Sequence, residues 1–234
     1  MSSLPLAEGR LLLSELFVSV QGEGILTGVP SVFVRTGACN LRCKWCDTPE
    51  TSWSPSGQVR EVESVVREVL AHDVKHVVLT GGEPLLPKGI EPLARALHEA
   101  GRHLTVETAG TIHKDLPVDL WSLSPKLASS VPEHPRWGPR HDALRLNREV
   151  LRRYVATGRY QLKLVMADPS EIAEVDALVG ELAAAPERVL LMPEGVDTER
   201  LDAVAEWLVP LCTERGYRFC DRLHIRLFGH TRGT

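Results

Sequence analysis

The feature that most constrains the fold of this 234-residue chain is an alternation of short apolar runs with segments of helical periodicity. The apolar runs are typical of buried strands, and the periodic segments place apolar side chains on one helix face. Strands that alternate with helices indicate right-handed βαβ units and a parallel sheet covered by helices. We therefore expect an α/β fold with mostly parallel strands, either an open sheet or an incomplete β/α barrel, in a single domain spanning residues 1–234.

Residue spacing sets the expected bounds of these elements. Strands are predicted at 11–20, 31–36, 76–79, 104–107, 120–124, 161–166, 189–192 and 223–228. Helices are predicted at 59–70, 90–97, 144–156, 170–184 and 198–215. The interval 127–140 contains three prolines and two consecutive serines, so it is predicted to be an irregular loop.

Charge and hydropathy argue against two classes of protein. The net charge is −4 and the isoelectric point is near 6.1, which disfavours a broad surface for binding nucleic-acid phosphates. No apolar run approaches the roughly 20 residues that a membrane span requires. Residues 1–10 lack the basic stretch and apolar core of a secretory signal. We expect a cytoplasmic protein that acts on a small molecule, with no nucleic-acid or membrane partner.

The cysteines are distributed unlike those of a disulfide framework. There are five, an odd number, and Cys39, Cys43 and Cys46 fall within eight residues. Such a cluster suits metal binding in a reducing compartment. Cys212 lies in an apolar helical pattern and Cys220 lies beside a predicted strand, so both are expected to be small buried hydrophobes.

Three thiolates in one short loop suit either an iron–sulfur cluster or zinc. Structural zinc normally takes four protein ligands, often as two separated pairs, and no second Cys/His pair with that spacing is present. A [4Fe–4S] cluster with one iron free of protein ligands is the more economical interpretation, and a zinc site is the alternative.

The segment CNLRCKWC at 39–46 resembles the CxxxCxΦC cluster motif of the radical S-adenosylmethionine (SAM) superfamily, with Trp45 at the aromatic position. The resemblance implies a partial β/α barrel of the radical SAM type. It also implies that the free iron binds SAM, which is cleaved by an electron from the cluster to methionine and a 5′-deoxyadenosyl radical. TGGEP at 80–84 resembles the motif that holds the SAM amino group in that superfamily, although a glycine pair after a strand also suits a tight turn.

A narrower resemblance, to the 7-carboxy-7-deazaguanine synthase family, spans nearly the whole chain. It is carried by FVSVQGEG at 17–24, CDT at 46–48, ETAG at 107–110, SPK at 124–126 and HIRLFGHTRG at 224–233. The resemblance implies a lyase of the queuosine and 7-deazapurine pathway. Such an enzyme converts 6-carboxy-5,6,7,8-tetrahydropterin to 7-carboxy-7-deazaguanine with loss of ammonia, using SAM and Mg²⁺. A homodimer and a reducing electron donor of the flavodoxin or ferredoxin type are also implied.

The same resemblance assigns roles to individual residues. Substrate contacts are implied for Val20, Gln21, Gly22, Glu23, Arg35, Thr80 and His224. Arg35 would bind the pterin carboxylate, for which its planar fork is suited, whereas an arginine at a strand end often forms only a surface ion pair. His224 lies in an apolar run and could equally be a core residue.

Cofactor contacts are implied for a second set of residues, most of which follow predicted strands. This set comprises Gly81, Gly82, Glu83, Glu107, Ser124, Pro125, Lys126, Met192, Pro193, Glu194 and Gly195 for SAM. Thr48 would ligate Mg²⁺, the alternative being that it only caps a turn before Pro49. Because chemistry in α/β folds gathers at the carboxyl ends of the strands, we expect these segments to form one site.

Two departures from the family pattern affect individual contacts. Ala109 stands where the family often has Asn, and the chain has GHTRG at 229–233 where GNKRG is common. Two other functions fit parts of the sequence. Another small radical SAM enzyme, such as a glycyl-radical activase, would lack QGEG and CDT. A non-catalytic iron–sulfur or zinc-binding protein would have no need of TGGEP, SPK and MPEG around a pocket.

Overall fold

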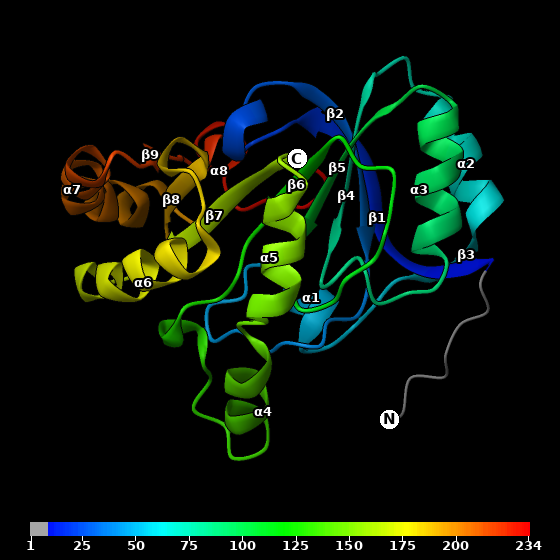
Figure 1. Cartoon of the computed structure of the whole chain (residues 1–234). Coiled ribbons are helices and arrows are strands. Elements are labelled where there is room, and N and C mark those ends of the chain that lie inside the picture. The colour runs from blue at the N-terminus through cyan, green and yellow to red at the C-terminus, as the bar shows by residue number, and fades with distance from the viewer. Residues whose placement is uncertain (1–8) are drawn as a thin grey trace.

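The computed structural model describes residues 9–234, which form one curved sheet with helices packed on its outer face (Figure 1). Within those residues the sheet has nine strands in the order β3-β1-β2-β4-β5-β6-β7-β8-β9. Their bounds are β1 Arg10–Val20, β2 Pro30–Thr36, β3 Gln58–Glu61, β4 His76–Gly81, β5 His103–Thr108, β6 Leu120–Leu123, β7 Tyr160–Met166, β8 Val189–Pro193 and β9 Arg218–Phe219.

Strand pairing makes the sheet a partial barrel. β1 is antiparallel to both β2 and β3, and every neighbouring pair from β2 to β9 is parallel. β3 and β9 stand at opposite edges and do not pair, so the barrel stays open. The predicted α/β class, the mostly parallel sheet and the incomplete barrel are confirmed.

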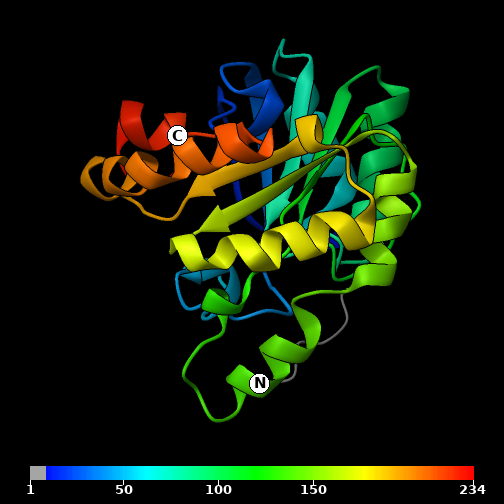
Figure 2. The same ribbon diagram turned by 60° about the vertical axis from the view of Figure 1, so that its left-hand side comes forward.

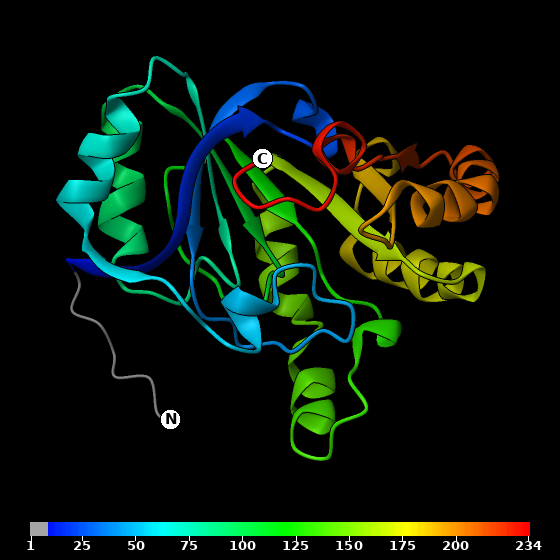
Figure 3. The same ribbon diagram turned by 180° about the vertical axis from the view of Figure 1, so that it is seen from behind.

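The longer helices cover the outside of the sheet. The helices are α1 Pro49–Ser52, α2 Val62–Leu70, α3 Ile90–Glu99, α4 Trp137–Leu144, α5 Arg148–Ala156, α6 Ile172–Leu182, α7 Thr198–Arg215 and α8 Leu223–Phe228. α2 and α3 pack side by side, and α6 and α7 flank β7 and β8 (Figure 2). Seen from behind, the opposite face carries the loop after β2 and the C-terminal segment instead of long helices (Figure 3).

Alternation along each strand separates the apolar core from the inner face. On β7, Leu162, Leu164 and Met166 join the apolar cluster beneath the helices, while Gln161 and Lys163 alternate with them and face inward. The same alternation puts polar or charged side chains of β4, β5 and β6 on the inner face. A strand pattern that is apolar on one face thus builds a polar interior at the open side of the barrel.

Several predicted segments differ from the structure, and the helix predicted at 144–156 begins only at Arg148, as α5. Residues 223–228 form α8 and not a strand, because only Ile225 of that apolar run is buried, while Leu227 and Phe228 are exposed. Val59 lies on β3, where it pairs with Leu12 of β1. The predicted helix therefore begins later, at Val62. The interval 127–140 is irregular only in part, since it contains a 3-10 turn at Ala128–Ser130 and the first turn of α4.

No helix within residues 9–234 is both long enough and apolar enough to cross a bilayer. Cys212 and Cys220 are buried, as predicted.

Candidate active site

The three clustered cysteines lie in the loop that follows β2 and line a cavity of about 430 Å³ at the open side of the barrel. They form a small cluster with Leu41 and Ala109, separate from the main core. No three His, Cys, Asp or Glu side chains in the described part of the chain converge closely enough to hold one metal ion. Three cysteine thiols on one loop match a cluster with one open iron and fall one ligand short of a four-ligand structural zinc site.

Two of the three thiols, those of Cys39 and Cys43, need a metal centre to ionise. Burial raises the pKa of Cys39 to about 12 and that of Cys43 to about 11, so both would be protonated without one. Iron supplies the positive charge that makes a buried thiolate stable. The residues therefore fit a [4Fe–4S] cluster held by Cys39, Cys43 and Cys46.

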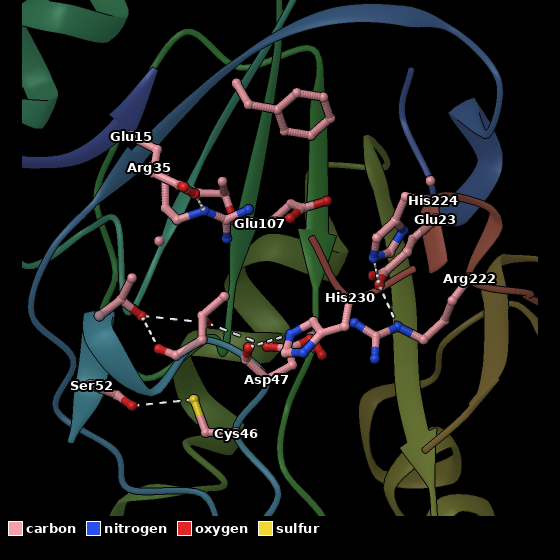
Figure 4. Close-up of a pocket in the computed structure, with 18 of the residues that line it drawn as sticks. Glu15, Glu23, Arg35, Cys46, Asp47, Ser52, Glu107, Arg222, His224 and His230 are labelled. Atoms are coloured by element: carbon pink, nitrogen blue, oxygen red, sulfur yellow. Dashed lines mark hydrogen bonds and ion pairs between the residues drawn. The ribbon is translucent and has the colours of Figure 1, made fainter. Parts of the chain in front are cut away.

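Gln21, Thr80 and Glu107 meet on the wall of the same cavity, although they come from three separate segments. Glu107 accepts hydrogen bonds from Gln21 Nε2 at 3.1 Å and from Thr80 Oγ1 at 3.0 Å. The two hydrogen bonds hold the carboxylate in place. Glu107 projects from β5 into the cavity (Figure 4). The expectation that the strand ends gather at one place is confirmed for this part of the site.

Glu23 is the centre of a buried charge network. Arg222 Nε donates to its carboxylate at 3.0 Å, and Lys163 pairs with its other oxygen. Arg222 also pairs with Asp47, and His224 Nε2 lies 4.0 Å from Glu23 (Figure 4). Burial would raise the pKa of the Glu23 carboxyl, but Lys163 and Arg222 outweigh it and hold that pKa well below its ordinary value.

Gly22 gives His224 its place beside this network. A Cβ on Gly22 would lie 2.0 Å from His224 Nδ1, so only glycine allows the imidazole to approach this closely. His224 therefore projects from α8 toward the cavity. The alternative of a core histidine in a strand is wrong, because the segment is helical and the side chain lines the site.

Arg35 lines the cavity and pairs with Glu15, its Nε donating at 2.9 Å. Arg232 donates to the other oxygen of Glu15 at 2.8 Å. The terminal nitrogens of Arg35 make no hydrogen bond within residues 9–234, and the guanidinium points into the cavity in Figure 4. Arg35 can therefore keep its ion pair and still bind a substrate carboxylate.

The residues implied for SAM divide into two groups. Gly81, Gly82, Glu107, Ser124, Lys126 and Met192 line the cavity, and Lys126 Nζ donates to Ser124 Oγ at 2.9 Å. Gly81 and Gly82 also pack tightly against the strand end and the cysteine loop, since a Cβ on Gly82 would lie 2.3 Å from the Ala38 carbonyl oxygen. The tight-turn interpretation and a place at the cavity wall are thus compatible.

Glu83, Pro125, Pro193, Glu194 and Gly195 are not among the residues that line the cavity. Glu83 is fully buried and accepts hydrogen bonds from Thr108 Oγ1 at 2.8 Å and from the Ala109 amide at 3.0 Å. It thereby ties TGGEP to ETAG. Glu194 pairs with Arg200, and the Gly195 carbonyl accepts from Arg222 at 2.6 Å. A SAM contact from these residues stays a prediction.

Thr48 lines the cavity with a weakly bound hydroxyl. It occupies the N-cap position of α1, yet its side chain makes no capping hydrogen bond. The nearest partners of Oγ1 are Asp47 Oδ1 and Thr51 Oγ1, each at 3.4 Å. The Thr48 hydroxyl can therefore turn toward a ligand in the cavity.

Sequence reasoning missed three members of the charge network and the contribution of the C-terminus. Lys163 could have been found, because a charged residue at an alternate position of an otherwise apolar strand indicates an inward-facing site. Asp47 lies inside the quoted CDT motif. Arg222 had no local signal. Residues 230–234 also line the cavity, and His230 Nε2 lies 2.8 Å from the Asp47 carbonyl oxygen.

Comparison with known proteins agrees with this geometry. The sequence model of the Radical SAM superfamily matches residues 33–124. The chain is 48% identical to the 7-carboxy-7-deazaguanine synthase of Rhodopirellula baltica, over 97% of this chain and 90% of that protein. It is 46% identical to the protein of that name from Halobacterium salinarum, over 93% of this chain and 90% of that one.

Solved structures share the fold. The crystal structure of QueE from Escherichia coli superposes with a TM-score of 0.69 at 24% identity, covering 92% of this chain and 95% of that one. Streptococcus suis SuiB gives a TM-score of 0.57 at 18% identity, covering 82% of this chain and 48% of that one. The structural likeness supports the open radical SAM barrel. From the sequence identity and its coverage, the chain belongs to the 7-carboxy-7-deazaguanine synthase family of the radical SAM superfamily.

Proposed function

We propose that the chain catalyses the reaction for which its relatives are named. The substrate is 6-carboxy-5,6,7,8-tetrahydropterin, and the products are 7-carboxy-7-deazaguanine and ammonia, which makes the protein a lyase of 7-deazapurine biosynthesis. The observation that carries this proposal is one cavity in which three cysteines face Arg35, Glu23 and Glu107. A centre held by these thiols would share the cavity with charged groups of both signs.

The cofactors of this family are a [4Fe–4S] cluster and SAM. Together they supply a 5′-deoxyadenosyl radical that removes a hydrogen atom from the substrate. We assign the cluster to Cys39, Cys43 and Cys46, and SAM to the wall formed by Gly82 and Lys126 with Ser124 and Met192. These side chains would hold SAM in the cavity that the cluster and the pterin would share.

The substrate fits the charges on the opposite wall. Its carboxylate would take the free guanidinium nitrogens of Arg35, which form a bidentate fork. The pterin's amino edge presents two N–H donors, and Glu23, held ionised by Lys163 and Arg222, is an acceptor of matching shape. Val20, Gln21 and Gly22 would contact the ring from the same turn, with Thr80 and His224 at its sides.

Three further features belong to the proposal. Thr48 would bind Mg²⁺ with its hydroxyl, and water and substrate oxygens would complete the coordination. An electron donor of the flavodoxin or ferredoxin type would reduce the cluster. We also expect a single-domain homodimer in the cytoplasm, where reduced cysteines are stable. Sedimentation or light scattering tests the dimer, and cluster reduction by purified flavodoxin or ferredoxin tests the donor.

The decisive experiment is anaerobic reconstitution followed by incubation with SAM, Mg²⁺ and 6-carboxytetrahydropterin. We expect about four irons per chain, and formation of 7-carboxy-7-deazaguanine and ammonia, detected by mass spectrometry and an ammonia assay. Cys43→Ala should lose SAM cleavage, whereas Cys212→Ala, which changes a buried cysteine on α7, should keep it. SAM cleavage by the wild type without pterin turnover would overturn the substrate assignment and favour another radical SAM activity.

A further inference from the structure

A segment outside the proposed mechanism covers the cysteine loop from the outer side. It comprises residues 127–145, which leave the sheet after β6 and include the turn Ala128–Ser130 and α4. Figure 1 shows α4 below α5, beyond the edge of the sheet. We call residues 127–145 the brace segment, because several of its contacts fall on residues 39–44 of the cysteine loop.

The cysteine loop has little structure of its own. Residues 37–43 form no helix or strand, and Cys46 N to Cys43 O, at 3.4 Å, is a long backbone hydrogen bond within the loop. Its amides bind outward: Lys44 N donates to Ser130 O at 2.8 Å, and Arg42 N donates to His141 Nδ1 at 3.0 Å. The brace segment therefore supplies backbone bonds that the loop lacks.

His141 connects this amide to the interior of the brace segment. Because Nδ1 accepts from Arg42 N, the ring proton is on Nε2, which donates to Ser130 Oγ at 2.8 Å. Ser130 Oγ in turn donates to Leu127 O at 2.6 Å. Only the neutral ring can make both bonds, and burial lowers the pKa of His141 to about 4, which keeps it neutral.

A second connection runs through Trp137 on α4. The Arg42 guanidinium lies 4.4 Å from the centre of its ring. The same guanidinium donates to Cys39 O at 2.7 Å and to Leu41 O at 2.6 Å. Both the main chain and the side chain of Arg42 thus join the brace segment to the stretch that carries the first two cysteines.

We propose that His141 is a positioning residue that fixes the backbone of residues 39–44 in the conformation that binds the iron–sulfur cluster. The proposal rests on the cluster site proposed above. Outer contacts that orient metal ligands commonly change metal affinity by about 10–100-fold. Loss of the His141 contacts should therefore speed the loss of iron while the three thiols remain in place.

The test is the first-order rate at which an iron chelator removes iron from the anaerobically reconstituted protein. We expect His141→Ala to release iron about tenfold faster than wild type or more. His141→Asn keeps an acceptor near the position of Nδ1 for Arg42 N but does not reach Ser130, so it should restore most of the slow release. His98→Ala, which changes an exposed histidine at the end of α3, should behave like wild type.

A second control separates positioning from general stability. Leu208 is fully buried on α7 in the main core, outside the small cluster around the cysteines. Leu208→Ala should lower the unfolding temperature yet keep the wild-type rate of iron release.

If His141→Ala does not fold, His141→Leu carries the same test, because it fills the space of the imidazole but offers no acceptor to Arg42 N. The proposal is overturned if the folded His141→Ala or His141→Leu protein releases iron at the wild-type rate, or if Leu208→Ala releases iron as fast as that His141 variant. Failure of wild type to bind iron would instead overturn the cluster site.

Discussion

Arg222 and Glu23 are 199 positions apart in the sequence, and the Nε of Arg222 donates to the Glu23 carboxylate at 3.0 Å. The pair joins the start of α8 to the turn that follows β1. Arg222 also binds Asp47 beside the cysteine loop and the Gly195 carbonyl after β8. One buried cation thus connects the segments proposed to bind substrate, cluster and SAM.

We expect Arg222→Ala to impair pterin turnover through Glu23. Truncating one partner of a buried charge pair costs roughly 2–5 kcal/mol, so kcat/KM for the pterin should fall by about 30-fold or more. Because a cation is lost, the pKa of Glu23 should rise, and the acid limb of kcat/KM should move to higher pH. Arg226→Ala is the matched control, because its guanidinium pairs with Asp202 and Asp221 and forms no ion pair with Glu23 or Asp47 within residues 9–234. An unshifted acid limb in Arg222→Ala would contradict the role given to Glu23.

Arg35→Ala should weaken pterin binding far more than SAM binding. The affinity for the pterin should fall by about 30-fold to several thousand-fold. Calorimetry with each ligand separately measures the two affinities. Glu15→Gln distinguishes a direct contact from a structural one, because it weakens the ion pair and leaves the guanidinium in the cavity. Equal losses for both ligands would show that Arg35 is structural, and the same pterin loss in Glu15→Gln would show that Arg35 acts through Glu15.

Ser52 is expected to tune the cluster. Its Oγ lies 3.2 Å from Cys46 Sγ, and a ligating thiolate can only accept, so the hydroxyl must donate. Such a bond stabilises the more negative, reduced cluster and raises its potential. Ser52→Ala should lower the midpoint, giving up to roughly tenfold less reduced cluster at a fixed potential, or about 59 mV. Spectroscopic redox titration measures this, with the exposed Ser54→Ala as control. Equal midpoints for wild type and Ser52→Ala would refute it.

Acidification should destabilise the fold partly through His76. Burial lowers its pKa, the neighbouring charges of His103 and Lys75 add to this, and Asp119 opposes it. The unfolded state, with a pKa of about 6.5, then binds the proton more tightly. Stability is therefore full above pH ~6.5 and falls as the pH drops through ~6.5 toward the lower folded value. His76→Val should show a smaller decrease in unfolding temperature between about pH 7.5 and 5.5 than wild type. An identical decrease would exclude His76 as a contributor.

The fold was largely predictable because strand and helix periods are local properties. The β7 pattern shows why: apolar alternation marks the outer face, and the polar residues between mark the inner one. The prediction of a strand at 223–228 failed, because an apolar stretch of six residues fits either a strand or a short helix. In the structure this stretch is helical and buries Ile225 alone.

The site was predictable only where a motif carries the chemistry. The cysteine spacing and the strand-end motifs identified Cys39 and Glu107, which both line the cavity. Ion pairs between distant segments leave no local pattern, so Arg222 could not be found. The structure also separates a motif's members: Gly82 lines the cavity while Glu83 is buried behind it, a difference that depends on the path of the turn.

The magnesium site is the most specific test of the narrower function, because a general radical SAM mechanism does not require it. Thr48 lies two residues after Cys46 on the same cavity wall, and its hydroxyl makes only long contacts. Mg²⁺ prefers octahedral oxygen coordination and commonly keeps several waters, so one protein hydroxyl and the substrate oxygens can suffice. The ion would hold the pterin carboxylate in the orientation that turnover requires.

Thr48→Ala should therefore leave iron content and SAM affinity nearly unchanged, while it lowers turnover and raises the Mg²⁺ concentration that gives half the maximal rate. Ser54→Ala serves as the control, because it removes an exposed hydroxyl just after α1 that does not line the cavity. Wild-type turnover that survives exhaustive chelation, or a Thr48→Ala variant with the wild-type Mg²⁺ response, would remove the metal from the site and leave the cluster assignment intact.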